Sequence, residues 1–342
     1  MKRILIFRTG GIGDVILSSV ALNVINSCEI SCEIIWAGRT PCIDLIKDCY
    51  PNIHTFNLDK SKSNFKLFIE LKSKLKGLDL IIDLQKSPRT ILMSFLLKFK
   101  FFRAKYVTWN KLSLQRTWMV FRANLRGRKQ IEGFLIKALP SRVELMADCC
   151  IRGLRKLSIN PSKTKLTPRL IKSDEKENYM AFCLGSLYPL KELSITYQKT
   201  IISYCFDTLK LQTLYLLGDV NKQLEAEALQ NHFSTKNIVN LCGKTSLTEA
   251  AQILSKCMFS VANDSALAHL SEAVNTPVMM FFGPTHESLG YRPYLKKSMA
   301  FSSSITCRPC HKSGNTTCRF GDEKCKTNLP MDSVYRHLQD LV

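Results

Sequence analysis

The stretch RILIFRTGGIGDVILSSVAL, residues 3–22, joins a strand pattern to a helix pattern through a glycine turn. Its opening apolar run is typical of a buried parallel strand, and apolar residues at helical spacing begin directly after Asp14. Three glycines between them, Gly10, Gly11 and Gly13, allow a tight turn and a close approach of a ligand to the backbone. This order predicts the first strand and helix of a doubly wound α/β sheet.

The alternation of strand and helix patterns continues through both halves of the chain. The predicted strands cover residues 3–8, 32–38, 53–58, 78–84, 104–109, 179–185, 213–218, 238–243, 259–263, 277–283 and 298–303. Strands that alternate with helices indicate parallel sheets, here one in each half, joined by the polar stretch 158–178. Ligands of such sheets bind at the carboxyl ends of the strands, so we expect the chemistry in the loops after the strands, facing a cleft between the domains.

Length and composition predict a globular protein of two domains. The chain has 342 residues, of which 45% are hydrophobic, and no run of 18 uncharged apolar residues occurs. The start of the chain is interpreted as a strand and not as a signal peptide, which predicts a cytoplasmic protein. Ten of the 14 cysteines are scattered through apolar segments and are predicted to be buried reduced thiols.

Positive charge is concentrated in the first half of the chain. The net charge is +21, and residues 1–170 hold 31 Lys and Arg against 12 Asp and Glu. Between Leu84 and Ile131 twelve cationic residues occur among aromatic ones without an acidic residue. Such a surface suits an anionic membrane, a phosphorylated lipid or a nucleic acid.

Asp14 stands at the mouth of the first glycine loop. A carboxylate in the first turn of a helix can act as a general base toward a hydroxyl nucleophile, but it can also be a plain helix cap. The dinucleotide-binding spacing G-x-G-x-x-G is broken at Ile16, and no acidic residue closes the strand 32–38. These departures argue against a nicotinamide cofactor.

Two loops of the second half suit a phosphorylated ligand. Asp264 and Ser265 lie between a buried strand and an Ala-rich helix, so backbone amides, a hydroxyl and the imidazole of His269 converge there. Lys191 follows the strand 179–185 and is a mobile charge suited to a phosphate. Taken singly, His269 could be a packed helix histidine and Lys191 a surface lysine.

Four motifs resemble the ADP-heptose:lipopolysaccharide heptosyltransferases of glycosyltransferase family 9, over nearly the whole chain. They are RTGGIGDVILSSVAL at 8–22, DLIIDLQKSPRT at 79–90, LGSLYPLKELS at 184–194 and NDSALAHLSEAVNTPVMMFFGPT at 263–285. The resemblance implies a GT-B fold with two Rossmann-like domains and an inverting transfer, in which an acceptor hydroxyl attacks the anomeric carbon of a nucleotide-activated heptose. We expect an N-terminal acceptor domain at 1–165, a C-terminal nucleotide-sugar domain at 175–326, and a last helix at 327–342 that packs back on the first domain.

The resemblance also implies roles for single residues. Asp14 would be the general base, and Lys191 would contact the phosphates of the sugar donor. The other residues implied in substrate binding are Gly11, Gly13, Ser186, Gly218, Thr245, Asp264, Ser265, Ala266, Leu267 and His269, and those implied at the acceptor are Arg8, Lys86 and Arg89. Ala266 departs from the family, which usually has glycine at this position.

The expected partners are a nucleotide-sugar donor, the anionic lipid-linked core of lipopolysaccharide and an anionic membrane at its cytoplasmic face. No cofactor and no catalytic metal are expected. The competing functions are a nicotinamide-dependent sugar-nucleotide oxidoreductase and a basic nucleic-acid-binding protein, although the sequence contains no recognised nucleic-acid-binding module.

Four late cysteines form a cluster with the spacing C-x2-C-x7-C-x6-C. Four thiolates could bind a structural zinc, but the second pair lacks a tight C-x2-C knuckle, and disulfides or free thiols are the alternatives. Members of the family often carry a similar segment, so the cluster is interpreted as structural. Its members are Cys307, Cys310, Cys318 and Cys325.

Overall fold

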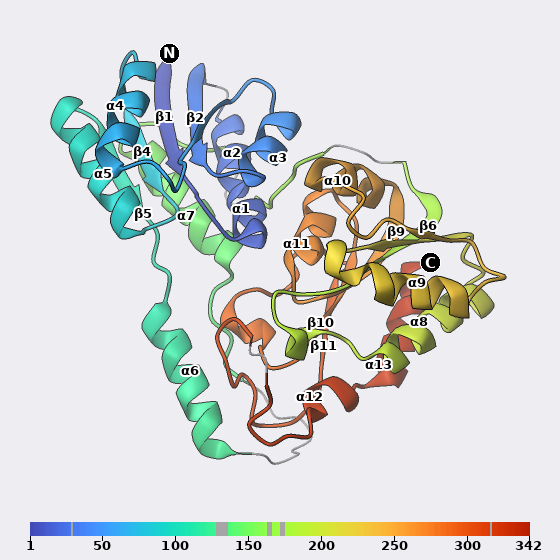
Figure 1. Ribbon diagram of the computed structural model, residues 1–342. Coiled ribbons are helices and arrows are strands. Elements are labelled where there is room, and N and C mark those ends of the chain that lie inside the picture. Colours follow the sequence, from blue (N-terminus) through green and yellow to red (C-terminus); the bar gives the residue numbers. More distant parts are fainter. Residues whose placement is uncertain (29, 128–135, 163–165, 172–174, 315–316) are drawn as a thin grey trace. The chain divides into compact units, whose positions relative to one another are not determined.

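The computed structural model describes residues 1–28, 30–127, 136–162, 166–171, 175–314 and 317–342 (Figure 1). Two compact units make up the chain: one consists of Met1–Lys111 and Arg142–Leu170, the other of Leu112–Ser141 and Ile171–Val342. Each unit is a parallel sheet with helices on both faces. The predicted pair of doubly wound α/β domains is therefore confirmed.

The first unit is built on a five-stranded parallel sheet in the order β3-β2-β1-β4-β5. Its strands are β1 (Lys2–Phe7), β2 (Cys32–Gly38), β3 (His54–Asn57), β4 (Leu80–Asp83) and β5 (Lys105–Thr108). Its helices are α1 (Ile12–Ser18), α2 (Val20–Asn26), α3 (Cys42–Cys49), α4 (Asn64–Lys74), α5 (Pro88–Lys100) and α7 (Arg142–Arg155). Each strand overlaps a predicted one. Leu5 and Phe7 of β1 share a core with Leu67 of α4 and Leu97 of α5, while α7 packs against β4 and β5.

The second unit holds a six-stranded parallel sheet in the order β11-β10-β9-β6-β7-β8. Its strands, which again overlap the predicted ones, are β6 (Glu177–Cys183), β7 (Thr213–Leu217), β8 (Ile238–Asn240), β9 (Cys257–Asn263), β10 (Val278–Phe282) and β11 (Met299–Ser302). Its α-helices are α6 (Ser113–Arg126), α8 (Ile195–Asp207), α9 (Gln223–His232), α10 (Leu247–Lys256), α11 (Ala266–Ala273), α12 (Lys324–Thr327) and α13 (Met331–Leu341). Short 3₁₀ turns cover Pro189–Lys191, Val220–Lys222 and Glu287–Leu289.

Each sheet has one point where the direction of winding reverses. In the first unit the chain moves outward from β1 to β3 and then returns to the other side of β1 for β4. In the second it moves from β6 to β8 and returns to the other side of β6 for β9. The loops after β1 and β4, and after β6 and β9, therefore diverge and leave a crevice at the carboxyl ends of the strands.

Two helices belong to a different unit from the one the sequence suggested. The segment 112–141, predicted with the first domain, clusters with the second unit, where Arg116 Nε of α6 donates to the carbonyl of Leu289 at 2.8 Å. Helix α13, predicted to pack on the first domain, buries Val334 and Leu338 in the core that contains Met180 of β6. The apolar stripe of α13 thus packs into the core of its own unit, which accounts for this placement.

Across the described parts of the chain, every helix is too short or too polar to span a membrane.

Candidate active site

Asp14 lies in the first turn of α1, and its carboxylate contacts arginine side chains. Arg8 Nη2 lies 2.6 Å from Oδ2, and Arg142 Nη1 lies 2.6 Å from Oδ1. Gly11 precedes the helix, and no side chain caps the helix there, so the interpretation of Asp14 as a plain cap is wrong. Side-chain exposure is 23% for Asp14, against 3% for Arg8 and 13% for Arg142. The carboxylate is therefore held between two guanidinium groups and is still reachable from solvent.

Gly11 allows the loop a backbone conformation that leaves space beside Asp14. Its φ of +74° lies in the left-handed region that side-chain-bearing residues rarely adopt. A β-carbon at this position would also lie 3.3 Å from Oδ2 of Asp14. The glycine therefore leaves space beside the carboxylate.

Further cationic and aromatic groups surround the carboxylate. The ring of Trp109, buried just after β5, has the guanidinium carbons of Arg8 and Arg142 at 5.9 and 5.4 Å from its centroid. The pKa of Lys111 is lowered, mainly by burial and then by the nearby charges of Arg8 and Arg142. The charges of Asp83 and Asp14 act on this pKa in the opposite direction. The cluster thus carries more positive than negative charge, which suits an anionic ligand.

Asp83, buried at the end of β4, shapes the loop on the other side of this crevice. Its Oδ1 accepts the backbone N–H of Lys86 at 2.7 Å, and its Oδ2 accepts the hydroxyl of Thr90 at 3.0 Å. Burial raises the pKa of Asp83. The loop leaves the Lys86 side chain exposed, whereas Arg89 is half-buried and donates to the carbonyl of Asp59 at 3.3 Å.

In the second unit, a buried ion pair lies at the corresponding switch point. Lys191, in the turn after β6, has its Nζ 2.8 Å from Oδ2 of Asp264, which follows β9 directly. Thr285, after β10, donates its hydroxyl to the same oxygen at 2.8 Å. Side-chain exposure is 10% for Lys191 and 8% for Asp264. The interpretation of Lys191 as a surface lysine is therefore wrong.

Asn263 ties the two loops of this crevice together. Its Oδ1 accepts the N–H of Leu193 at 2.8 Å, and its Nδ2 donates to the carbonyl of Gly185 at 3.2 Å. In the same loop, the N–H of Ser186 donates to Oε1 of Glu192 at 3.2 Å. These bonds hold the turn that carries Lys191.

The start of α11 carries most of the other predicted residues. Ser265 precedes the helix without capping it through its side chain, and Ala266 begins the helix. Ser265, Ala266 and Leu267 are half-buried, so the first backbone N–H groups of the helix lie close to the surface at this edge of the sheet. His269 is buried, and its ring centroid lies 6.0 Å from that of Tyr291.

The turns after β7 and β8 hold the last two predicted residues of this unit. The carbonyl of Gly218 accepts the N–H of Gly243 at 2.9 Å, which joins the two turns. Thr245 is half-buried and precedes Ser246, the capping residue of α10. Both predicted residues thus lie at the carboxyl edge of the second sheet.

Three residues of these sites were not predicted from the sequence: Arg142, Trp109 and Thr285. Arg142 is 128 positions from Asp14, and no periodic pattern reveals a pair at that separation. Thr285 lies within the recognised stretch 263–285 but was not singled out.

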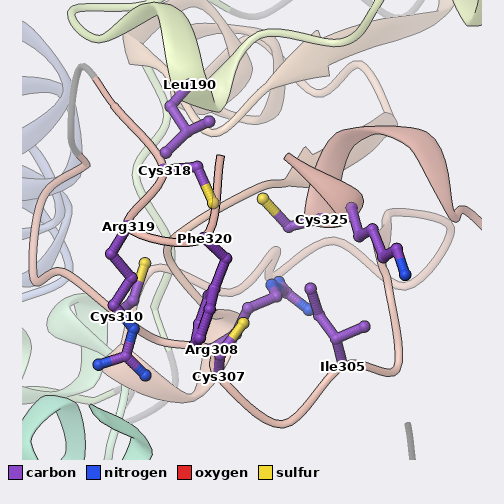
Figure 2. A pocket seen from close by; sticks show the side chains of 10 residues that line it. Leu190, Ile305, Cys307, Arg308, Cys310, Cys318, Arg319, Phe320 and Cys325 are labelled. Atoms are coloured by element: carbon purple, nitrogen blue, oxygen red, sulfur yellow. The ribbon is translucent and has the colours of Figure 1, made fainter. Parts of the chain in front are cut away.

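The four late cysteines line a small cavity (Figure 2). Its volume is about 20 Å³, and Arg308 lies among the cysteines, with Leu190 on another wall. Burial raises the pKa of Cys310 and raises that of Cys325 to about 12. Among the residues the structure describes, no three His, Cys, Asp or Glu side chains are arranged to hold a metal ion. The zinc site that was one of the predicted alternatives therefore has no set of ligands among the described residues.

Two solved heptosyltransferase structures have the same fold. Escherichia coli ADP-heptose lipopolysaccharide heptosyltransferase II superimposes with a TM-score of 0.69 at 17% identity, covering 100% of this chain and 98% of that one. An E. coli heptosyltransferase solved with ADP gives a TM-score of 0.68 at 16% identity, covering 99% and 100%. The two doubly wound sheets therefore define a GT-B glycosyltransferase fold, as the resemblance implied.

Sequence comparisons define the family. The model of glycosyltransferase family 9 (heptosyltransferase) matches residues 145–320, more than half of the chain, so the chain belongs to this family. Lipooligosaccharide heptosyltransferase 2 of Haemophilus ducreyi is 28% identical over 145 residues, 41% of this chain and 40% of that protein. The protein of the same name from Haemophilus influenzae is 49% identical over 47 residues, 14% of each. The chain thus matches less than half the length of these relatives.

Proposed function

We propose that the protein is an inverting glycosyltransferase that moves a heptose from a nucleotide-activated donor, ADP-heptose, to a hydroxyl of the lipopolysaccharide inner core. The observation that carries this proposal is the carboxylate of Asp14, held by two arginines and open to solvent at a switch point of the first sheet. The names of the family and of its relatives, which are heptosyltransferases, support the choice of sugar.

On the acceptor side, Asp14 would take the proton of the attacking hydroxyl. Arg8 is almost fully buried and donates to the carbonyl of Leu84 as well as to Asp14, so we assign it to holding the carboxylate instead of contacting the acceptor. Lys86 is exposed, and together with Arg89 it remains our proposed contact for the anionic acceptor. The excess positive charge around Asp14 would attract phosphate or carboxylate groups of the core.

On the sugar-donor side, Lys191 and the first N–H groups of α11 would bind the diphosphate. Both positive groups would stabilise the nucleoside diphosphate as it leaves. Asp264 would position Lys191, since it holds the lysine Nζ at 2.8 Å. Ala266 places a β-carbon at the start of α11, so we expect a sugar donor that leaves space at this point.

A screen of sugar donors with purified protein tests this function. Release of nucleoside diphosphate should be fast with ADP-heptose and should require a lipopolysaccharide core acceptor. Release that does not depend on the acceptor, or that occurs only with another nucleotide sugar, would refute the proposed reaction.

We also propose that residues 92–105, which include most of α5, the turn after it and the first residue of β5, contact the anionic cytoplasmic face of a membrane. Large apolar side chains are exposed there, among them Phe95 at 67%, Phe99 at 87% and Phe102 at 76%. The exposed cations beside them are Lys98, Lys100, Arg103 and Lys105. We call these seven residues the α5 patch. Apolar rings flanked by long cationic side chains suit a surface that lies on anionic headgroups, with about 1 kcal/mol for each cation.

Changing the four cations of the α5 patch to glutamine should lower binding to anionic vesicles at least tenfold, measured by sedimentation at low and at high salt. The control is a variant with Lys210, Lys256, Lys296 and Lys297 changed to glutamine, which removes the same charge from exposed positions of the second unit. The control should bind vesicles nearly as well as the unaltered protein. Binding that is insensitive to salt, or equally weakened in both variants, would count against a specific membrane contact.

A further inference from the structure

Arg308 is the most deeply buried cationic side chain at the carboxyl edge of the second sheet. It is 1% exposed, and burial lowers its pKa. Its guanidinium donates to the carbonyls of Ser303 at 2.7 Å, Phe282 at 3.1 Å and Thr285 at 2.9 Å, and also to that of Gly283. A buried charge is tolerated only when its N–H groups have acceptors, and here backbone carbonyls provide them.

Three of these four carbonyls belong to residues 282–285, which are the last residue of β10 and the turn after it and are called the turn 282–285 below. Because an arginine offers five N–H groups in a fixed plane, one side chain can hold the whole turn in a single shape. The N–H of Cys310 also donates to the carbonyl of Pro284 at 3.0 Å. The segment 308–310 therefore fixes this turn in two ways: through the side chain of Arg308 and through the backbone N–H of Cys310.

The turn 282–285, held in this way, contacts both members of the Lys191–Asp264 ion pair. Thr285 donates its hydroxyl to Oδ2 of Asp264, the oxygen that also contacts Lys191. On the other side, Gly283 packs so tightly that a β-carbon would lie 2.7 Å from the carbonyl of Leu190 and 3.4 Å from Cα of Lys191. A shift of the turn would therefore move both the carboxylate and the backbone that carries the lysine.

We propose that Arg308 is a positioning residue for nucleoside diphosphate binding, which acts through the turn 282–285 and Thr285 on Asp264 and Lys191. This inference rests on the proposed assignment of Lys191 to the diphosphate. It also gives the C-x2-C segment a function in which no metal takes part: the segment delivers a guanidinium to the turn beside the sugar-donor site.

A pair of threonine variants tests the route through Thr285. Thr285→Val keeps the shape and removes the bond to Asp264, so the affinity for ADP, measured by calorimetry, should fall about tenfold. Thr276→Val is the matched control: Thr276 is equally buried before β10, at the opposite edge, and its hydroxyl donates to the carbonyl of Leu254 at 2.6 Å. It should lower the melting temperature and leave ADP affinity within about twofold of the original value. Equal effects of the two variants on ADP affinity would overturn the inference.

Variants of Arg308 test its own part. Arg308→Met should weaken ADP binding about tenfold and raise the KM for the sugar donor more than it lowers kcat, while Arg308→Lys should be intermediate. Combined with Thr285→Val, Arg308→Met should add little, because both act on the same contact. A purely structural arginine would lower the melting temperature without changing ADP affinity in the folded protein. Should Arg308→Met not fold, Arg308→Lys tests this part instead: it keeps the charge but loses the planar set of donors, so it should still weaken ADP binding, and unchanged ADP affinity would overturn the role of Arg308.

Lys191→Ala, measured in parallel, distinguishes failure of the Arg308 positioning role from failure of the proposed diphosphate site. Weaker ADP binding in Lys191→Ala with unchanged binding in Arg308→Met and Thr285→Val would overturn only the role of Arg308. Unchanged ADP binding in Lys191→Ala would overturn the diphosphate site itself, and the positioning role with it.

Discussion

Replacing Asp14 with asparagine should lower the turnover number for heptose transfer by about 10²-fold or more. The change preserves the size of the side chain but removes the group that would accept the proton of the attacking hydroxyl. Affinity for ADP should barely change, because the proposed diphosphate contacts lie in the other unit. Initial rates of ADP release with saturating sugar donor and acceptor, together with calorimetry of ADP binding, measure both quantities.

Asp79→Asn is the matched control for this prediction. Asp79 lies at the amino end of β4, where its Oδ2 accepts the N–H of Arg3 at 2.9 Å, so it is remote from the crevice in the same sheet. Its variant should keep its turnover number. Because Asp14→Asn also removes the negative charge that Arg8 and Arg142 contact, melting temperatures of both variants must be compared. A folded Asp14→Asn protein with normal turnover would exclude Asp14 as the base.

The strands of both sheets could be predicted from the sequence because both faces of each sheet are covered by helices. Parallel strands covered by helices on both faces are buried throughout, so they appear in the sequence as short continuous apolar runs such as 278–282. The glycine turns after them mark the carboxyl edges, where the switch points place ligands. For these reasons the sequence predicted the fold and the loops that carry the candidate residues, whereas the crevice within each sheet follows from the strand order of the structure.

The placement of α6 and α13 was not predictable in the same way. Arg116 of α6 reaches a backbone carbonyl 173 positions away, and α13 adds its apolar stripe to a core formed by distant strands. An amphipathic pattern shows that a helix has a face to bury but not which sheet receives it. Assignment of such helices to a domain requires the three-dimensional structure.

The candidate site likewise contains residues that the sequence predicts and residues that only the structure shows. Asp14, Lys191 and Asp264 follow strands within recognisable motifs, whereas the groups that hold them come from other elements. Arg142 begins α7, and Thr285 acts on Asp264 from the next strand of the sheet. The sequence therefore predicted the proposed reacting and binding groups, and the structure adds the residues that orient them.

Lys191→Ala should weaken ADP binding by about 10²-fold and lower turnover as well. A charge-assisted hydrogen bond from the lysine to a phosphate contributes to both ground-state binding and stabilisation of the leaving group. The loss is expected to be large because the variant also leaves the Asp264 side chain, which is 8% exposed, without its cation. That negative charge would then oppose the diphosphate.

The double variant Lys191→Ala with Asp264→Asn separates these two contributions. Removing the second charge should restore part of the ADP affinity lost in Lys191→Ala, even though a contact of the site has been deleted. Lys176→Ala is the control, because its Nζ donates to Thr276 and to the carbonyl of Ser255 at the opposite edge of the same sheet. It removes an equal charge and should leave ADP affinity unchanged. If Lys191→Ala binds ADP as tightly as the Lys176 control, Lys191 only stabilises the fold through Asp264, and the diphosphate must bind elsewhere.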